Sequence, residues 1–310
     1  MKGLRGVLPA LITPLDKDGN VKKELAKSLI DLYVKHGAAG VYMLGWTGEG
    51  ADLSVEKRKE WAEAVLAASK GRIRVFVHVG YNENLNDSVE LAKHAAEHGA
   101  DAVSSVGIST KATLEDNIRY FQRISEAAPK IPFYIYWVMQ GSTLTGGKPM
   151  QPTEILKAME AVPTFAGIKF TDSNFYMLER FKKYAPDLNI LTGADELAFC
   201  SQLMGADGNI GALQAVTLYH YQTMFRYVEE GKIDEARKLQ YRANEVAEAY
   251  GDKRIGNLPG LKLLMERIYG IPVGYCSPDG PFKDKVVAKE DADRLEKIFR
   301  DNILLPEEYR

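Results

Sequence analysis

Short apolar runs alternate with longer amphipathic stretches along the first two thirds of this chain. Between the runs, apolar residues recur at helical spacing, as Leu25, Leu29 and Leu32 do. Nearly continuous apolar strands separated by amphipathic helices are typical of a parallel sheet that helices cover. Eight strand-and-helix units predict an α/β fold of the (β/α)8 TIM-barrel type. The eight predicted strands are residues 7–12, 41–44, 74–79, 102–106, 132–137, 165–170, 189–191 and 208–212.

Three junctions between a helical stretch and the next strand share one pattern, in which a glycine follows the last helical residue. We expect each glycine to cap its helix in the left-handed conformation, at Gly37, Gly99 and Gly205. The pattern ends near residue 215. Beyond it the chain predicts consecutive helices without a strand between them, at residues 217–250, 258–270 and 288–302. We therefore expect a barrel at residues 1–230 and a helical extension, packed on the barrel, at residues 231–310.

The bulk composition excludes several classes of protein. A length of 310 residues fits one barrel with an extension. The 40 Lys and Arg against 42 Asp and Glu give a net charge of −2, which provides no general attraction to nucleic acid or to a membrane. The first apolar run contains Pro9 and is too short for a signal peptide or a membrane span. With two widely spaced cysteines, Cys200 and Cys276, we expect a cytoplasmic protein.

Barrels of this type carry their active sites at the C-terminal ends of the strands, and the first candidate is the segment 45–50 (GWTGEG). A glycine-rich turn there can present backbone N–H groups and the Thr47 hydroxyl to an anion such as a carboxylate. The alternative is an ordinary turn that uses glycine for its positive φ. No Lys-Ser/Thr pair follows, so this is not a nucleotide-binding loop.

The second candidate is Tyr136, near the end of the fifth predicted strand. With period-two alternation, Tyr134 and Tyr136 share a face, and Tyr136 lies nearer the mouth of the barrel. A phenol at that place can relay protons. Aromatic packing in the core is the alternative.

The third candidate is Lys169, within the apolar sixth strand. A buried ammonium group is costly, so burial lowers the pKa of lysine and leaves a free amine that can attack a carbonyl. The alternative is a lysine that reaches solvent from the strand end or pairs with a nearby acid.

These three segments, in this order and spacing, resemble the dihydrodipicolinate synthase / N-acetylneuraminate lyase family of pyruvate-dependent aldolases. Residues 10–16 (ALITPLD) resemble the family's first strand and loop, and residues 45–49 resemble its G-x-T-G-E carboxylate-binding loop. Tyr136 falls where the catalytic tyrosine lies, and residues 167–169 (GIK) resemble the segment that carries the Schiff-base lysine. The resemblance extends over nearly the whole chain.

Within the family, the chain is most similar to the sialic acid lyase branch. Residues 193–196 (GADE) resemble its G-x-D-E segment, and residues 167–173 and 205–211 also match this branch. The resemblance implies a lyase that cleaves a 2-keto-3-deoxy sugar acid, such as N-acetylneuraminate, to pyruvate and an aldehyde, N-acetylmannosamine. It implies a homotetramer that needs no metal or prosthetic group.

The same resemblance assigns roles to individual residues. Lys169 would form the imine and Tyr136 would move the proton of the substrate hydroxyl. Thr47, with the amides of Trp46 and Thr47, would hold the substrate carboxylate. The rest of the substrate would be bound by Thr171, Gly193, Asp195, Glu196 and Gly211.

Several departures from the family pattern keep other substrates open. The loop at residues 137–146 is longer, lacks the usual proline and contains no arginine, and residues 106–110 contain no tyrosine. The missing arginine and the missing tyrosine count against dihydrodipicolinate synthesis. Trp46 and Ala212 stand where sialic acid lyases have small hydroxyl residues. A Schiff-base dehydratase, or an aldolase for a different 2-keto acid, is therefore the alternative, and a non-catalytic barrel that binds keto acids is a third hypothesis.

His94 and His98 are four residues apart on a polar helical stretch. This spacing suits two ligands of a metal ion, but the sequence indicates no third ligand. We therefore expect a solvated helix end here and no metal site.

Overall fold

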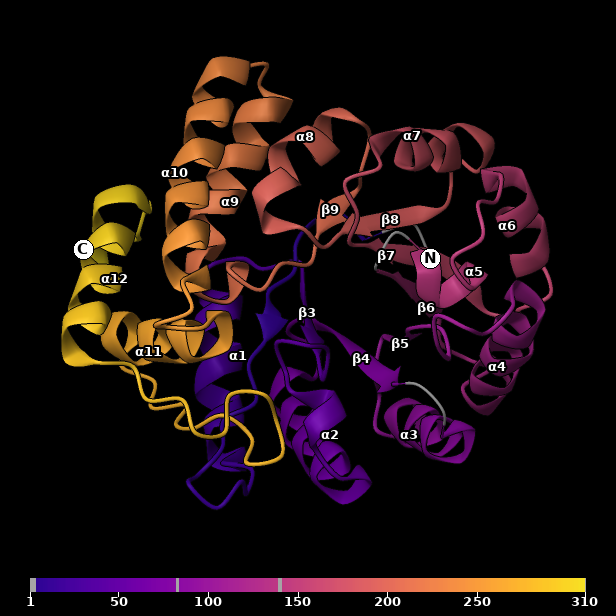
Figure 1. The fold of residues 1–310 in the computed structure, drawn as a ribbon, viewed down its shortest axis with the longest axis horizontal. Coiled ribbons are helices and arrows are strands. Elements are labelled where there is room, and N and C mark those ends of the chain that lie inside the picture. Colours follow the sequence, from indigo (N-terminus) through magenta and orange to yellow (C-terminus); the bar gives the residue numbers. More distant parts are fainter. Residues whose placement is uncertain (1–3, 82–83, 139–140, 310) are drawn as a thin grey trace.

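The computed structural model describes residues 4–81, 84–138 and 141–309, and it confirms the predicted barrel (Figure 1). All paired strands are parallel, with helices between them in sequence. All eight predicted strands are present. The sheet segments are β1 (Gly6–Val7), β2 (Ala10–Leu11), β3 (Gly40–Met43), β4 (Arg74–Gly80), β5 (Ala102–Ser105), β6 (Phe133–Trp137), β7 (Phe165–Phe170), β8 (Asn189–Thr192) and β9 (Gly208–Asn209).

The nine segments make eight strands, because β1 and β2 are two halves of the first predicted strand. Pro9 has no backbone N–H and stands between the halves. The first half pairs with β9, where the Leu8 amide donates to Asn209 O at 2.8 Å. The second half pairs with β3, and the Tyr42 amide donates to Pro9 O at 3.0 Å. The segment at residues 6–11 therefore bonds to both its neighbours and closes the barrel.

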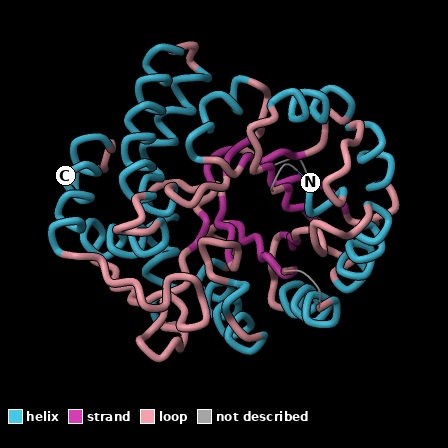
Figure 2. Tube along the Cα trace, in the orientation of Figure 1, coloured by secondary structure: helices cyan, strands magenta, loops and turns pink. Residues whose placement is uncertain are grey.

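The barrel helices surround the strands (Figure 2). They are α1 (Ala26–Lys35), α2 (Val55–Ser69), α3 (Leu85–Glu97), α4 (Leu114–Ala127), α6 (Pro152–Met159), α7 (Phe175–Tyr184), α8 (Ala198–Leu203) and α9 (Gln214–Glu229), with the short α5 (Ser142–Thr145) after β6. Single 3-10 turns are η1 (Lys23–Leu25), η2 (Gly50–Asp52), η4 (Asp195–Leu197) and η5 (Glu307–Tyr309). The predicted glycine caps are confirmed, since Gly37, Gly99 and Gly205 have φ of 70°, 89° and 93°.

The C-terminal part is helical, as predicted. It contains α10 (Ile233–Gly251), α11 (Asn257–Tyr269) and α12 (Lys289–Asn302), which lie together on one side of the barrel (Figure 1). The stretch predicted at residues 217–250 is divided between α9 and α10, with Gly231 at φ 75° in the turn. The division of the chain into two domains at residue 230 stays a prediction. No described helix is long and apolar enough to cross a membrane.

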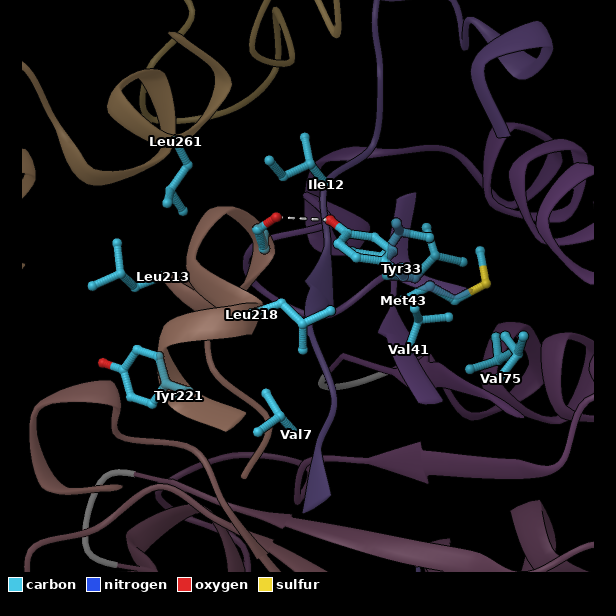
Figure 3. Packing of buried hydrophobic residues seen from close by; sticks show 14 of the residues in the cluster. Val7, Ile12, Tyr33, Val41, Met43, Val75, Leu213, Leu218, Tyr221 and Leu261 are labelled. Carbon is cyan, nitrogen blue, oxygen red and sulfur yellow. Dashed lines mark hydrogen bonds between the residues drawn. The ribbon is translucent and has the colours of Figure 1, made fainter. Parts of the chain in front are cut away.

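Two separate cores hold the barrel together. The larger one fills the space between strands and helices, where Tyr33 of α1 donates its hydroxyl to Ala215 O of α9 at 3.1 Å (Figure 3). The smaller one fills the barrel itself, and its members are Leu8, Ala10, Tyr42, Phe76, Ala102, Tyr134, Leu191 and Ile210. Because the interior is packed, the barrel is not a channel, and reactive groups are expected above this layer at the C-terminal ends of the strands.

Candidate active site

Lys169 lies inside the barrel near the C-terminal end of β7. Its Nζ is 4.0 Å from the centre of the Tyr42 ring and 4.2 Å from the centre of the Tyr136 ring. The residue is only 5% exposed, and among the described residues it forms no ion pair or hydrogen bond. Burial lowers the pKa of Lys169 to about 7, and the charge of Asp195 opposes this shift. A large fraction of Lys169 is therefore a neutral, nucleophilic amine near pH 7.

Tyr136 is the neighbour of Lys169 across the β6–β7 pairing. Its side chain is buried, and burial raises the pKa of Tyr136 to about 12, partly offset by the Thr171 hydroxyl. The phenol is therefore protonated at neutral pH. A protonated donor beside a neutral amine is the pair that carbonyl addition requires.

The segment at residues 45–50 forms a tight turn directly after β3. The Gly48 and Gly50 amides donate to Gly45 O at 3.0 and 3.3 Å, and the Glu49 amide donates to Trp46 O at 3.1 Å. In contrast, the amides of Trp46 and Thr47 have no acceptor within the described part of the chain. Thr47 is half-buried, so its hydroxyl and these two amides can bind an anion.

Gly45 places this turn against the lysine. A Cβ at Gly45 would lie 2.8 Å from Tyr42 Cε1 and 3.9 Å from Lys169 Nζ. The close approach requires glycine, and it places Gly45, the first residue of the turn, next to the amine. A 2-keto acid carries a carboxylate beside its ketone, so an anion-binding turn next to a nucleophilic amine suits this class of substrate.

Asp195 lies in η4, just after β8, and is 4% exposed. Its Oδ2 accepts a hydrogen bond from the Leu213 amide at 3.0 Å, whereas Oδ1 is buried without a partner among the described residues. Burial raises the pKa of Asp195 to about 7. A buried, unpaired oxygen at the barrel mouth is suited to a substrate hydroxyl, because an unmet polar group there is costly.

Two glycines make room for these polar side chains. A Cβ at Gly193 would lie 1.8 Å from Thr171 Oγ1, and a Cβ at Gly211 would lie 1.9 Å from Asp195 Oδ1. Glu196 differs from the others because its side chain is exposed. The structure thus places Lys169 beside Tyr136 and the turn, and pairs each glycine with a polar group that it accommodates.

Sequence reasoning missed a polar network around Tyr42, whose ring contacts Lys169. The Tyr42 hydroxyl lies 2.7 Å from His78 Nδ1 and donates to Ser104 Oγ at 3.1 Å. All three residues are buried, and burial lowers the pKa of His78 well below its usual range, so its ring is neutral. His78 Nε2 has no partner among the described residues. A histidine and a serine inside predicted apolar strands were the available signal for this network.

Sequence reasoning also missed how the turn at residues 45–50 is anchored. Glu49 is buried with φ 54°, and its Oε2 lies 2.6 Å from Nζ of Lys262 on α11. Its Oε1 accepts from the Ser277 amide at 2.5 Å. Lys262 also donates to Thr13 O at 3.1 Å and to Tyr275 O. The helical C-terminal part therefore holds the turn through a buried ion pair, which no local pattern in the sequence indicates.

Candidate metal ligands lie elsewhere. Among the described residues, the group of His, Cys, Asp and Glu side chains close enough to share one ion consists of Glu63, His94 and His98, on the outside of the barrel. The barrel mouth presents amine, phenol, hydroxyl, amide and carboxylate groups instead.

Comparison with known proteins shows that the chain is similar to N-acetylneuraminate lyases. The chain is 34% identical to an N-acetylneuraminate lyase of Xenopus tropicalis over 278 residues, covering 88% of this chain and 89% of the relative. It is 30% identical to the N-acetylneuraminate lyase of Escherichia fergusonii over 286 residues, covering 91% and 93%.

Solved structures agree in fold. The sialic acid aldolase of Ruminococcus gnavus superposes with a TM-score of 0.86 at 28% identity, covering 97% of this chain and 99% of that one. CdNal from Clostridium difficile, in complex with mannosamine, gives a TM-score of 0.87 at 28% identity over the same shares of the two chains. Residues 3–298 match the sequence pattern of the dihydrodipicolinate synthetase family. Because this match spans nearly the whole chain, the protein belongs to the dihydrodipicolinate synthetase family.

Proposed function

We propose that this protein is a class I aldolase that cleaves a 2-keto-3-deoxy sugar acid, such as N-acetylneuraminate, into pyruvate and N-acetylmannosamine. The observation that carries the proposal is Lys169, a buried lysine without an ion-pair partner among the described residues, whose pKa is lowered to about 7 beside Tyr136. The relatives named N-acetylneuraminate lyases support the same chemistry.

The reaction begins with attack of the Lys169 amine on the ketone carbon of the substrate. Tyr136 donates its proton to the ketone oxygen, water leaves, and an iminium cation remains on Lys169. The phenolate then takes the proton of the C4 hydroxyl while the C3–C4 bond breaks, which releases the aldehyde and leaves an enamine. Tyr136 returns this proton to C3, and water hydrolyses the imine to give pyruvate and the free amine.

The remaining groups orient the substrate. Thr47 and the amides of Trp46 and Thr47 hold the carboxylate, so that the ketone carbon faces Lys169. The unpartnered Oδ1 of Asp195 and the Thr171 hydroxyl bind hydroxyls along the sugar chain, with Gly193 and Gly211 leaving room for them. Glu196 extends this surface toward solvent. The chemistry needs no metal ion or prosthetic group, and we expect a cytoplasmic homotetramer.

A second function is favoured by Trp46. Its indole is 61% exposed and packs edge-to-face on Tyr81 with 6.1 Å between ring centres. An indole at this place in the turn cannot make the polar contact that a small hydroxyl residue provides in sialic acid lyases. A dehydratase, or an aldolase for a different 2-keto acid, would keep Lys169 and Tyr136 and would not need this contact.

Reductive trapping tests the shared chemistry. The protein is incubated with pyruvate and borohydride, and intact mass and peptide mapping locate the adduct. We expect one pyruvyl group on Lys169 and no adduct in Lys169→Met. Folded protein without an adduct would support a non-catalytic barrel. Product analysis with N-acetylneuraminate then separates the two enzymes, because cleavage yields pyruvate and an amino sugar whereas dehydration keeps the carbon chain intact.

A further inference from the structure

Three side chains meet on the outer surface of the barrel, away from Lys169. Glu63 extends from α2, and His94 and His98 belong to the end of α3, and these two helices are neighbours in the ring (Figure 1). His94 Nε2 lies 2.9 Å and His98 Nε2 lies 3.9 Å from Glu63 Oε1. One potential ligand atom from each residue lies within 4.8 Å of the other two. The third ligand, which the sequence did not indicate, is therefore supplied by a different helix.

The hydrogen bonds of the cluster fix which ring nitrogen is free. His98 Nδ1 lies 2.8 Å from the backbone carbonyl oxygen of His94. Because a carbonyl oxygen only accepts, Nδ1 must carry the proton, and in the neutral ring Nε2 of His98 holds a lone pair. A backbone carbonyl that accepts from the second ring nitrogen is the usual support of a metal-binding histidine.

Both histidines face one carboxylate oxygen. The Nε2 atoms of His94 and His98 lie 2.9 and 3.9 Å from Glu63 Oε1. The two imidazole rings stack with 4.1 Å between centres and an angle of 30°, so both present an edge to the same carboxylate. A cation shared by the three atoms would replace the proton between His94 Nε2 and Glu63 Oε1, and it would also bind the lone pair of His98 Nε2.

We propose that Glu63, His94 and His98 form an open three-ligand site for a divalent transition-metal ion of the zinc class, with water completing the coordination. Two imidazole nitrogens and one carboxylate are a ligand set that zinc adopts. Tetrahedral ligands at zinc distances stand about 3.3 Å apart, which lies between the two distances to Glu63 Oε1. Calcium and magnesium prefer all-oxygen ligands, so they are not expected to bind tightly here.

The surroundings indicate a role in stability. An open cavity of about 810 Å³ adjoins the cluster, and its lining includes Glu63, His98 and Glu97 together with residues 71–74, which lead into the N-terminal end of β4. This is the end of the barrel opposite the catalytic mouth, where residues serve stability rather than chemistry. A metal ion bound only in the folded state would link α2 to α3 and raise the free energy of unfolding by mass action.

Metal binding is tested on tag-free, chelator-treated full-length protein with Zn²⁺ or Co²⁺ as the probe. Equilibrium titration gives stoichiometry and affinity, Co²⁺ absorption reports the ligand geometry, and thermal melts report stability. We expect one site per chain and a rise in melting temperature with Zn²⁺, with no change from Mg²⁺. In His98→Ala and in Glu63→Gln the affinity should fall at least about tenfold, because each variant loses a ligand.

His36→Ala provides the matched control. His36 follows the last residue of α1, and its Nε2 lies 3.7 Å from Glu308 Oε1. It therefore forms a similar pair of histidine and carboxylate, but without a second histidine. This variant should bind Zn²⁺ like the wild type. The proposal is wrong if the wild type shows no site, or if His98→Ala and Glu63→Gln bind as tightly as the wild type. Either result would make the cluster an ordinary ion pair. Two independent ligand variants keep the test decisive if one of them fails to fold.

Discussion

Among the described residues two lysines are buried, and they have opposite surroundings. Lys169 lies in the barrel interior between two tyrosine rings, without an ion pair among the described residues. Lys262 belongs to α11, and its side chain reaches the turn after β3. Its Nζ lies 2.6 Å from Glu49 Oε2 and donates to two backbone carbonyls. Both are at most 5% exposed. Burial makes an ammonium group costly in both places, but only Lys262 has acceptors that offset this cost.

The contrast also separates chemistry from support. An amine without partners can attack a carbonyl, whereas a cation with three acceptors cannot. The paired lysine instead fixes Glu49, whose backbone belongs to the turn that we propose holds the substrate carboxylate. Lys262 therefore helps to position the turn that lies next to the reactive Lys169.

Replacing Lys169 tests the reactive half of the comparison and should have the largest effect. In Lys169→Met, kcat/KM for the cleaved keto acid should fall at least about 10⁴-fold, because no imine can form. Pyruvate release, measured with a coupled assay, checks this loss. Activity close to that of the wild type would mean that a different residue carries the chemistry.

The same variant should be more stable than the wild type. The pKa of Lys169 is about 7 in the folded protein and 10.5 for the ordinary side chain, a difference worth at most about 5 kcal/mol. Between these two values the unfolded chain binds more protons, so the stability of the wild type rises with pH. The gain from Lys169→Met should therefore be largest below pH 7 and shrink toward pH 10, as denaturant unfolding at several pH values would show.

Replacing Lys262 should act in the opposite direction. Lys262→Met leaves Glu49 buried without its cation, and breaking a buried pair on one side costs about 3–5 kcal/mol of unfolding free energy. The loosened turn should also raise KM for the cleaved keto acid more than it lowers kcat. Denaturant unfolding and steady-state kinetics measure the two effects.

The double variant Glu49→Gln/Lys262→Met is the control, since it removes both charges. It should recover part of the lost stability, because no unpaired charge remains. If Lys262→Met unfolds like the wild type, the ion pair is not what holds the turn.

The pH dependence of imine formation sharpens the contrast further. Only the free amine of Lys169 reacts, so the trapping rate with pyruvate should rise about tenfold per pH unit below 7 and level off above it. The Asp195 carboxylate raises the pKa of Lys169, so Asp195→Asn should move the midpoint to lower pH. Rates of borohydride trapping from pH 5 to 9 measure both curves. A midpoint near the ordinary lysine value would show that the amine is not desolvated.

The sequence predicted one of these lysines and not the other, for a physical reason. Lys169 interrupts an apolar strand, where a charged residue stands out against the pattern. The eight strands and the glycine caps were also predictable, because each depends on a local pattern in the sequence. Lys262 lies in an amphipathic helix, where lysine is ordinary. Its partners, Glu49 and Thr13, are far away in the chain, so only the folded structure brings them together. The Tyr42 network was missed because its hydrogen bonds connect three different strands.

The smallest predicted effect concerns how Tyr42 supports the amine. Tyr42→Phe keeps the ring beside Lys169 but removes the hydroxyl that bonds to His78 and Ser104. Loss of such hydrogen bonds costs about 1–1.5 kcal/mol of stabilisation. Because the ring then loses its fixed orientation beside Lys169, we expect the transition state to lose this amount, and kcat for pyruvate release to fall about tenfold. Tyr134→Phe is the matched control, because Tyr134 belongs to the same interior core but pairs with Gly167 in β7, and its hydroxyl donates to Asn189 Oδ1 at 2.9 Å. It should lose similar stability and keep its kcat. Equal loss of kcat in both variants would mean that the barrel interior acts as a whole, and that the partners of Tyr42 do not orient the unpaired lysine.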